Sequence, residues 1–237
     1  MRRQLTRKAT AEAVGTALLV AIVVGSGIYA QRLSPNDVGL QLLENSTATA
    51  LGLVALILAF GPVSGAHFNP VVTLADRYLG GIDTETATTY VLAQVVGGCV
   101  GTVIANLMFD LDAIDWSTHA RSSGGLWLGE GVATFGLLLV ILGVVRSGRA
   151  AAAPFAVGGY IGAAYWFTSS TSFANPAVTI ARTMSDTFAG IKPSSVPAFV
   201  LAQLAGGAAA VALATFLHPD FPSRADDLVV PHEQTTT

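Results

Sequence analysis

Charged residues and cysteine are scarce in this chain of 237 residues. Asp, Glu, Lys and Arg make up 11% of the sequence, whereas 52% of the residues are hydrophobic. A water-soluble domain needs more polar surface than this, so the composition favours a membrane protein with several spans. The only cysteine, Cys99, excludes an internal disulfide and offers no cysteine cluster for a metal. We expect Cys99 to be a small buried hydrophobic residue.

Six apolar stretches are long enough to form membrane spans, which need about 20 mainly apolar residues each. Two of them contain one acid each, Glu12 in the first and Glu130 in the fourth. The opening "MRRQLTRKAT" is basic, but no small-residue cleavage site follows, so we interpret the first stretch as a retained span. The predicted spans are residues 9–30, 45–62, 87–109, 126–146, 151–169 and 195–217.

Charge in the connecting segments predicts the orientation. Basic residues precede the first span and lie between the fourth and fifth, whereas the 110–125 connection is acidic. Because cytoplasmic loops are enriched in Lys and Arg, we expect both termini in the cytoplasm. The polar tail, 218–237, is expected to be partly disordered, with His218 and His232 solvated. The basic residues are Arg2, Arg3, Arg7, Lys8, Arg146 and Arg149.

The chain also repeats itself. "AEAVGT" at 11–16 recurs as "GEGVAT" at 129–134, and "VLAQVVGG" at 91–98 recurs as "VLAQLAGG" at 200–207. Between these pairs lie two Asn-Pro stretches, and the order and approximate spacing agree throughout. The sequence therefore consists of two related halves.

Each half carries three spans, an odd number, so the second half must enter the membrane from the opposite side. This predicts an inverted repeat whose pseudo-two-fold axis lies in the membrane plane. We expect one domain over residues 1–237, with halves at about 9–115 and 120–217.

Two short stretches carry the most specific signal: "HFNPVVTLADR" at 67–77 and "SFANPAVTIAR" at 172–182. Asn followed by Pro is typical of a helix start. The apolar run that follows is too short to cross a bilayer, and bare backbone at membrane depth is tolerated only inside protein or beside a watery cavity. One copy alone fits an ordinary buried helix start. Two copies in an inverted repeat favour paired re-entrant half-helices that meet at the midplane.

This geometry predicts a pore. The positive ends of both helix dipoles and the Asn NH2 donors would hold water or a hydroxylated solute and repel cations. The preceding "SGAHF" and "STSFA" would run extended and offer carbonyl acceptors, with Gly65 permitting close backbone approach. The predicted midplane residues are Asn69, Pro70, Val71, Asn175, Pro176 and Ala177, and the predicted loop residues are Gly65, Ala66, His67 and Thr171.

"SGAHFNPVVT" and "NPAVT", set within six spans, resemble the aquaporin and glycerol-facilitator channels, the major intrinsic protein family. The resemblance covers residues 9–217. It implies an all-α membrane channel with six transmembrane helices and two half-helices, without enzyme activity, cofactor or metal. It further implies passive flux of water or small neutral solutes and a homotetramer in the cytoplasmic membrane, with one pore per subunit.

The chain departs from the family pattern at both motifs. The family usually has Asn-Pro-Ala twice, but Val71 adds two methyl groups that the contact between the loops must accommodate. The family normally places Arg directly after the second motif, where this chain has Val178, and Thr171 replaces a Gly.

Counting from the motifs, as the resemblance suggests, adds Thr49, Ala163 and Ser172 to Val178 as the selectivity filter. This ring has no aromatic or charged member, so we expect a wide pore for bulky neutral solutes. The pattern is similar to bacterial aquaporin-like channels associated with arsenic resistance, which implies metalloid hydroxides or methylated arsenicals as cargo. A strict water channel is the alternative.

Two intramembrane acids leave a second class of function open. Glu12 and Glu130 occupy equivalent repeat positions, and as proton relays they would indicate a coupled transporter. In the family such acids instead accept hydrogen bonds from the loops, which supply donors that need a partner. We favour this scaffold role, and we expect Gln94 and Gln203 to form interhelical hydrogen bonds.

Two further residues have alternative roles. His67 is either a gate or a wall residue. Arg182 lies four residues after Val178 on one helix face, so its side chain either reaches the constriction or extends to the outer interface. Arg77, in a similar place in the first half, favours the interface for Arg182.

Overall fold

The protein is described here by a computed structural model that covers residues 2–218. The predicted disorder of the tail and the solvation of His232 fall outside these residues. Within 2–218 the chain forms helices and no strand, which confirms the all-α prediction. The α-helices are α1 (Arg2–Leu33), α2 (Val38–Ser64), α3 (Pro70–Leu79), α4 (Thr84–Met108), α5 (Gly124–Arg146), α6 (Ala153–Phe167), α7 (Pro176–Ala181) and α8 (Val196–Leu217). Three 3-10 turns are η1 (Ala150–Ala152), η2 (Arg182–Met184) and η3 (Pro193–Ser195).

Six of these helices are the predicted spans, and two are the predicted half-helices. Helices α1, α2, α4, α5 and α8 are long and apolar enough to cross a membrane. Helix α6 is shorter than predicted, with 15 residues after the turn η1. Helix α1 is longer than predicted because its basic first turns continue the helix beyond the apolar stretch. Hydropathy marks only the part of a helix that lies in lipid.

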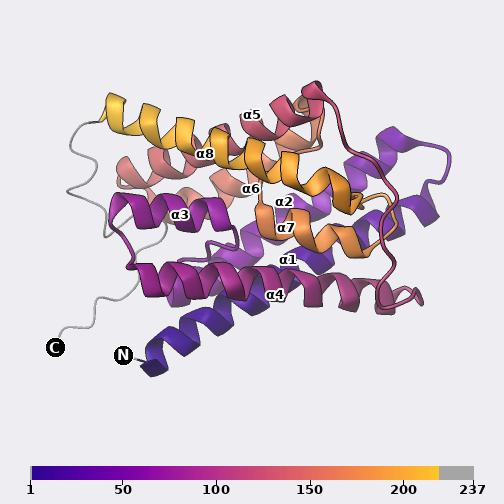
Figure 1. Ribbon diagram of the computed structural model, residues 1–237, viewed down its shortest axis with the longest axis horizontal. Coiled ribbons are helices and arrows are strands. Elements are labelled where there is room, and N and C mark those ends of the chain that lie inside the picture. The colour runs from indigo at the N-terminus through magenta and orange to yellow at the C-terminus, as the bar shows by residue number, and fades with distance from the viewer. Residues whose placement is uncertain (1, 219–237) are drawn as a thin grey trace.

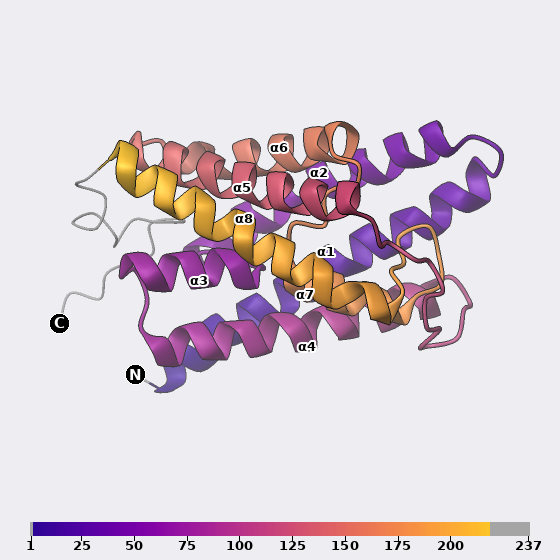
Figure 2. The ribbon, with the colours of Figure 1, turned by 45° about the horizontal axis from the view of Figure 1, so that its top comes forward.

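The two short helices lie one after the other along the bundle, enclosed by the long ones (Figure 1 and Figure 2). Helix α3 packs against α4 and α8, and α7 packs against the same two helices. The N-termini of α3 and α7 meet near the middle of the molecule. This is the arrangement of an inverted repeat with two re-entrant half-helices.

The repeated glycines explain how closely the spans approach. A Cβ atom at Gly97 or Gly101 of α4 would collide with the backbone of α1, and one at Gly206 of α8 would collide with the backbone of α5. Small residues allow such close crossings between membrane helices. Cys99, on the same helix as Gly97, is a free thiol that is only half-buried against the core.

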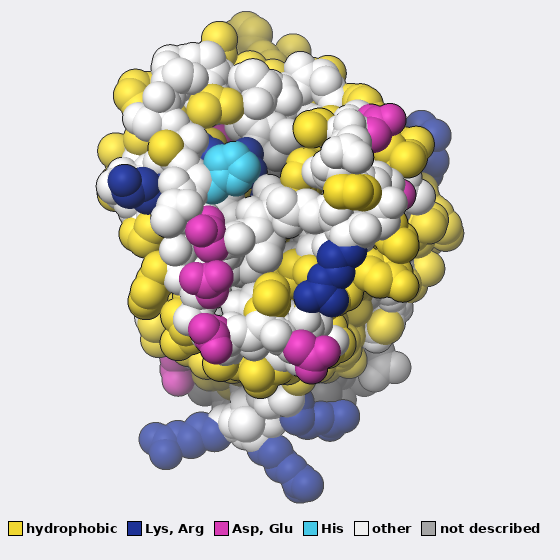
Figure 3. Space-filling view, turned by 90° about the vertical axis from the view of Figure 1, so that its right-hand side faces the viewer, with side chains coloured by type: hydrophobic (Ala, Val, Ile, Leu, Met, Phe, Trp, Pro, Cys, Tyr) yellow, Lys and Arg dark blue, Asp and Glu magenta, His cyan; other side chains and the backbone are white. Residues whose placement is uncertain are grey.

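The ends of the bundle differ in the segments they carry. The start of α1, the end of α8 and the α5–α6 connection lie at one end, and the 109–123 connection lies at the other (Figure 1 and Figure 2). Figure 3 looks onto the latter end, where charged and histidine side chains spread over the centre and hydrophobic ones gather toward the edges. Asp112 and Asp115 of this connection are exposed. The two predicted basic segments therefore share one end, and the acidic connection occupies the other.

Candidate functional site

The two motif asparagines begin the two half-helices. Asn69 caps α3, where its Oδ1 accepts a hydrogen bond from the Val71 N–H at 2.9 Å. Asn175 caps α7 in the same way, with Oδ1 accepting from Ala177 and Val178 at 3.0 and 3.2 Å. In each half the following Pro is the first helical residue, where its missing N–H costs nothing.

The same asparagines also tie the halves together. The Asn69 Nδ2 donates to the Ala174 carbonyl and the Asn175 Nδ2 donates to the Phe68 carbonyl, each at 2.7 Å. An amide nitrogen carries two hydrogens. One N–H of each asparagine is therefore used between the loops, and one remains for the lumen, fewer than the sequence suggested.

The loops before the asparagines are not extended, so this prediction is wrong. Non-glycine residues in each loop have positive φ angles, a conformation that costs L-residues about 1–2 kcal/mol each. The affected positions are equivalent in the two halves, which shows that both loops follow the same path. They are Ala66 (50°) and Phe68 (49°), then Ser172 (54°) and Ala174 (47°), with Gly65 (87°) matched by Thr171 (61°).

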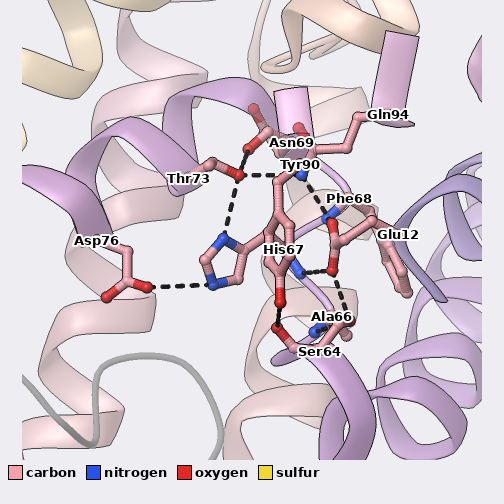
Figure 4. Close-up of polar contacts among 10 residues, drawn as sticks. All are labelled: Glu12, Ser64, Ala66, His67, Phe68, Asn69, Thr73, Asp76, Tyr90 and Gln94. Carbon is pink, nitrogen blue, oxygen red and sulfur yellow. Dashed lines mark hydrogen bonds and ion pairs between the residues drawn. The ribbon is translucent and has the colours of Figure 1, made fainter. Parts of the chain in front are cut away.

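Glu12 holds the first loop in this path (Figure 4). Its carboxylate accepts the N–H groups of His67 at 3.0 Å and Phe68 at 2.7 Å. It also accepts from the Ser64 hydroxyl at 2.6 Å and the Gln94 amide at 2.7 Å. Glu12 is 0% exposed, so all of these groups find their acceptor inside the protein. These hydrogen bonds hold the loop in its path despite the strain of the positive φ angles.

Glu130 does the same for the second loop. It accepts the N–H groups of Phe173 and Ala174 at 2.9 Å and the Gln203 amide at 2.6 Å. Gln203 continues to the Thr179 hydroxyl at 2.8 Å, so α8 is linked to α5 and α7.

Gln94 makes the corresponding bond to Thr73 at 2.9 Å. The interhelical role predicted for Gln94 and Gln203 is confirmed, but the two threonines were missed. The sequence could have indicated both threonines, because each stands four residues after the motif Asn. The hydroxyl of each also donates to the carbonyl of that Asn.

A second buried cluster lies beside the first loop (Figure 4). The His67 Nε2 lies 3.4 Å from the Asp76 carboxylate, and its Nδ1 lies 3.1 Å from the Thr73 hydroxyl. Its ring packs edge-on against Tyr90, with centroids 5.3 Å apart. These contacts fix His67 in the wall. Sequence reasoning did not identify Asp76.

A cavity, here called the pore cavity, runs between the halves and is lined by both Asn69 and Asn175. Spans α1, α2, α5 and α6 supply mostly aliphatic walls. Neither Glu12 nor Glu130 belongs to the lining. The residues singled out from the sequence that line it are Thr49, Ala66, His67, Asn69, Ser172, Asn175, Val178 and Arg182. Those that do not are Gly65, Pro70, Val71, Ala163, Thr171, Pro176 and Ala177.

The placement of Ala163 in the filter is wrong. This residue is exposed on the outer face of α6, whereas Ile161 and Tyr165 line the pore cavity. Two residues along a helix turn a side chain to the opposite face, so counting from the motif gave the wrong helix phase. Tyr165 also brings an aromatic ring into the lining, and its hydroxyl lies 3.1 Å from the Thr49 hydroxyl.

Arg182 does not extend to the outer interface. It is 2% exposed and lines the pore cavity, with its guanidinium carbon 3.4 Å from the centre of the Phe173 ring. Its Nε donates to the Ala189 carbonyl. Arg77 is a poor guide to Arg182, because it is exposed and donates to the Thr84 hydroxyl. The lining of the pore cavity therefore contains an arginine, although none of the four predicted filter residues is charged.

The methyl groups of Val71 are accommodated away from the loop contact. A Cβ atom at Gly207 of α8 would collide with the Val71 Cγ1, so this glycine provides the space. In the second half, a Cβ at Gly98 would lie 3.3 Å from the carbonyl oxygen of Ala177, the residue equivalent to Val71. The sequence predicted that the contact between the two loops would accommodate these methyl groups. This prediction is wrong, because the space is provided by α8.

The sequence matches the major intrinsic protein family over residues 1–174. The chain belongs to this family. It is 51% identical to the aquaglyceroporin AqpS of Rhizobium meliloti, over 90% of this chain and 91% of that protein. It is 29% identical to the probable aquaporin AqpM of Archaeoglobus fulgidus, over 92% and 99% of the two chains.

The structure is also similar to that of a solved major intrinsic protein, the aquaglyceroporin from Plasmodium falciparum. The TM-score is 0.68 at 20% identity, with 92% of this chain and 98% of the other covered, so this likeness supports the fold. As a member of the family, the protein is a membrane channel and not an enzyme.

Proposed function

We propose that this channel conducts water and small neutral solutes, including glycerol, metalloid hydroxides and methylated arsenicals, passively and in both directions. The observation that carries the proposal is Val178. It lines the pore cavity directly after the second motif, where the family places Arg. A valine contributes methyl groups and no donor, so a solute larger than water meets neither a charge nor a long side chain at this position. The relative named as an aquaglyceroporin, at 51% identity, supports the same conclusion.

The geometry of the midplane suits neutral, oxygen-bearing solutes. The remaining N–H of each asparagine and the two helix N-termini offer partial positive charge to an acceptor oxygen. The walls around them are aliphatic, with Leu19, Val23 and Ile141 in the lining. A hydroxylated solute can exchange water for these donors, whereas the two positive helix N-termini repel a cation. The predicted midplane and filter roles of Asn69, Asn175, Thr49 and Ser172 are part of this proposal.

A strict water channel is the second candidate. Tyr165 and Arg182 in the lining favour it, because an aromatic ring and a guanidinium both narrow a passage. A proton-coupled transporter is less well supported. Glu12 and Glu130 lie outside the lining, and loop donors occupy their carboxylates. We therefore assign both acids a scaffold role.

We further propose the cytoplasmic membrane as the location, with both termini in the cytoplasm. The basic residues before α1 and between α5 and α6 lie at one end of the bundle, as the positive-inside rule requires. Family membership supports a homotetramer with one pore per subunit. Residues 1–237 then form a single domain with halves at 9–115 and 120–217.

A flux panel tests the proposal. Purified protein in liposomes is compared with the Val178→Arg variant for water, glycerol, urea, and trivalent and pentavalent arsenicals, at matched protein content. We expect the wild type to pass all classes, and the variant to lose the larger solutes while water flux falls less. A wild type that passes water alone would overturn the broad-solute proposal. Equal solute flux in both proteins would show that Val178 is not part of the filter.

A further inference from the structure

The two half-helices carry buried charges of opposite sign at equivalent positions. Asp76 and Arg182 each stand seven residues after the motif Asn, and they are 7% and 2% exposed. Each contacts the ring that stands two residues before that Asn. Asp76 lies 3.4 Å from the His67 imidazole, and the Arg182 guanidinium lies 3.4 Å from the centre of the Phe173 ring.

Only the positive member of this pair reaches the pore cavity. Arg182 is part of the lining, whereas Asp76 lies behind His67 and outside it. Among the described residues no Asp or Glu lines the cavity. Of the Lys, Arg, Asp and Glu residues that the structure describes, Arg182 alone lines the cavity. The fixed charge of the lumen is therefore positive and lies in the second half.

The protein fixes the position of Arg182 but leaves some of its hydrogen-bond donors without a partner. Its Nε donates to the Ala189 carbonyl, and its plane is set by the Phe173 ring, which packs in turn on Phe199 at 5.3 Å. Within residues 2–218 the two terminal nitrogens of Arg182 make no protein hydrogen bond. Ser172, which directly precedes Phe173 in the chain and lines the same cavity, has a buried Oγ without a partner. Unpaired donors in a buried site favour a ligand that accepts hydrogen bonds.

We propose that Arg182 and Ser172 form a donor site that binds the acceptor oxygen of a passing neutral solute and excludes cations. Arg182, seven residues after Asn175, supplies the positive charge that Val178 does not provide. A buried guanidinium repels a second positive charge strongly because little water screens it. Its planar donors suit a carbonyl or oxo oxygen, and urea is a simple probe of that class. This proposal rests on the channel function but not on the width of the pore.

The test compares Arg182→Met, Arg182→Lys and Arg182→Gln with a control, Arg77→Met, in which an exposed arginine outside the cavity is removed. The purified full-length proteins are placed in liposomes. Methylammonium entry and urea flux are measured, each relative to water flux through the same sample. Because every reading is divided by water flux, the result does not depend on whether glycerol or arsenicals pass. Failure of the broad-solute proposal is thus distinguishable from failure of this one.

We expect Arg182→Met to raise the methylammonium-to-water ratio by about tenfold or more, as the loss of a nearby buried charge implies. Its urea-to-water ratio should fall. Arg182→Lys should keep cations out, because it retains the charge, and Arg77→Met should match the wild type. If Arg182→Met does not fold, Arg182→Gln keeps an amide donor for the Ala189 carbonyl and serves as the neutral variant. Unchanged cation exclusion in a water-conducting neutral variant would overturn the proposal.

Discussion

The two halves of the channel share the residues that shape the loop backbone but differ at several equivalent positions beside it. Both halves have a capping Asn, a crossed hydrogen bond, a loop with positive φ angles and a buried Glu that accepts the loop N–H groups. A re-entrant loop needs these groups at either end of the pore, because its polar backbone lies at membrane depth. Their repetition is a requirement of the fold.

Other equivalent positions carry different residues in the two halves. His67 and Asp76 of the first half correspond to Phe173 and Arg182 of the second, and Val71 corresponds to Ala177. Exchanges at these positions leave the backbone path unchanged, since the loop angles agree within a few tens of degrees. Two halves that fold alike can therefore carry different side chains beside the pore.

We expect the greatest loss from removal of the two buried acids that both halves share. Substitution of Glu12 or Glu130 by Ala leaves buried loop donors without an acceptor, at about 1–3 kcal/mol for each group. We expect both variants to lose folded protein, and Glu12→Ala more than Glu130→Ala, because Glu12 accepts from four groups and Glu130 from three. Detergent-solubilised yield and thermal unfolding measure the loss.

The conservative variants Glu12→Gln and Glu130→Gln serve as controls for the same prediction. They retain one acceptor oxygen, so they should fold better than the Ala variants. An imposed proton gradient should neither drive solute accumulation nor change its endpoint in the wild type. Concentrative uptake would contradict the scaffold role and favour a coupled transporter.

A second prediction concerns the space that α8 provides for Val71, the residue equivalent to Ala177. A Gly207→Ala change places a methyl group against the Val71 Cγ1 and should destabilise the protein by about 1–3 kcal/mol, as overpacking does. The double variant Gly207→Ala with Val71→Ala should recover most of this loss. Thermal unfolding of the wild type, both single variants and the double variant gives the coupling. Independent, additive effects would show that the two residues do not share this space.

A smaller effect on stability, with a large effect on flux, is expected at the midplane. Asn69→Leu or Asn175→Leu removes a helix cap worth about 1 kcal/mol and one crossed hydrogen bond. The loss of the lumen N–H should lower water flux in both variants, to a similar extent because the two sites are equivalent. Swelling of liposomes with matched protein content measures it. Full flux through a well-folded Asn175→Leu protein would exclude this residue from the conduction path.

The mildest consequence is expected at Gly65 and Thr171. Both have positive φ angles, 87° for Gly65 and 61° for Thr171. A β-branched residue is strained there and glycine is not. We expect Thr171→Gly to leave stability unchanged or raise it by up to about 1 kcal/mol. The reverse change, Gly65→Thr, should destabilise the first loop. Equal losses for both changes in thermal unfolding would show that the two loops are not equally strained.

The architecture of this protein follows from its amino-acid sequence alone. Low charge, six apolar stretches, an odd number of spans per half and the doubled Asn-Pro stretch were sufficient for the fold and the family. They are local patterns, and lipid imposes the same physical requirement on each of them: backbone groups must be paired and charges must be few. The matching places of Gln94 and Gln203 in the repeat also predicted that both form interhelical hydrogen bonds, although not with which residues.

Which side chains face the lumen, by contrast, depends on how the helices pack. Tyr165 lines the pore cavity and Ala163 does not, Arg182 turns inward onto Phe173 while Arg77 is exposed, and Val71 is accommodated by Gly207. A shift of two residues in helix phase reverses the direction of a side chain, and spacing along the chain does not fix that phase. The direction of Arg182 further depends on Ala189 and Phe173, contacts that exist only once the segment after α7 has folded back onto it.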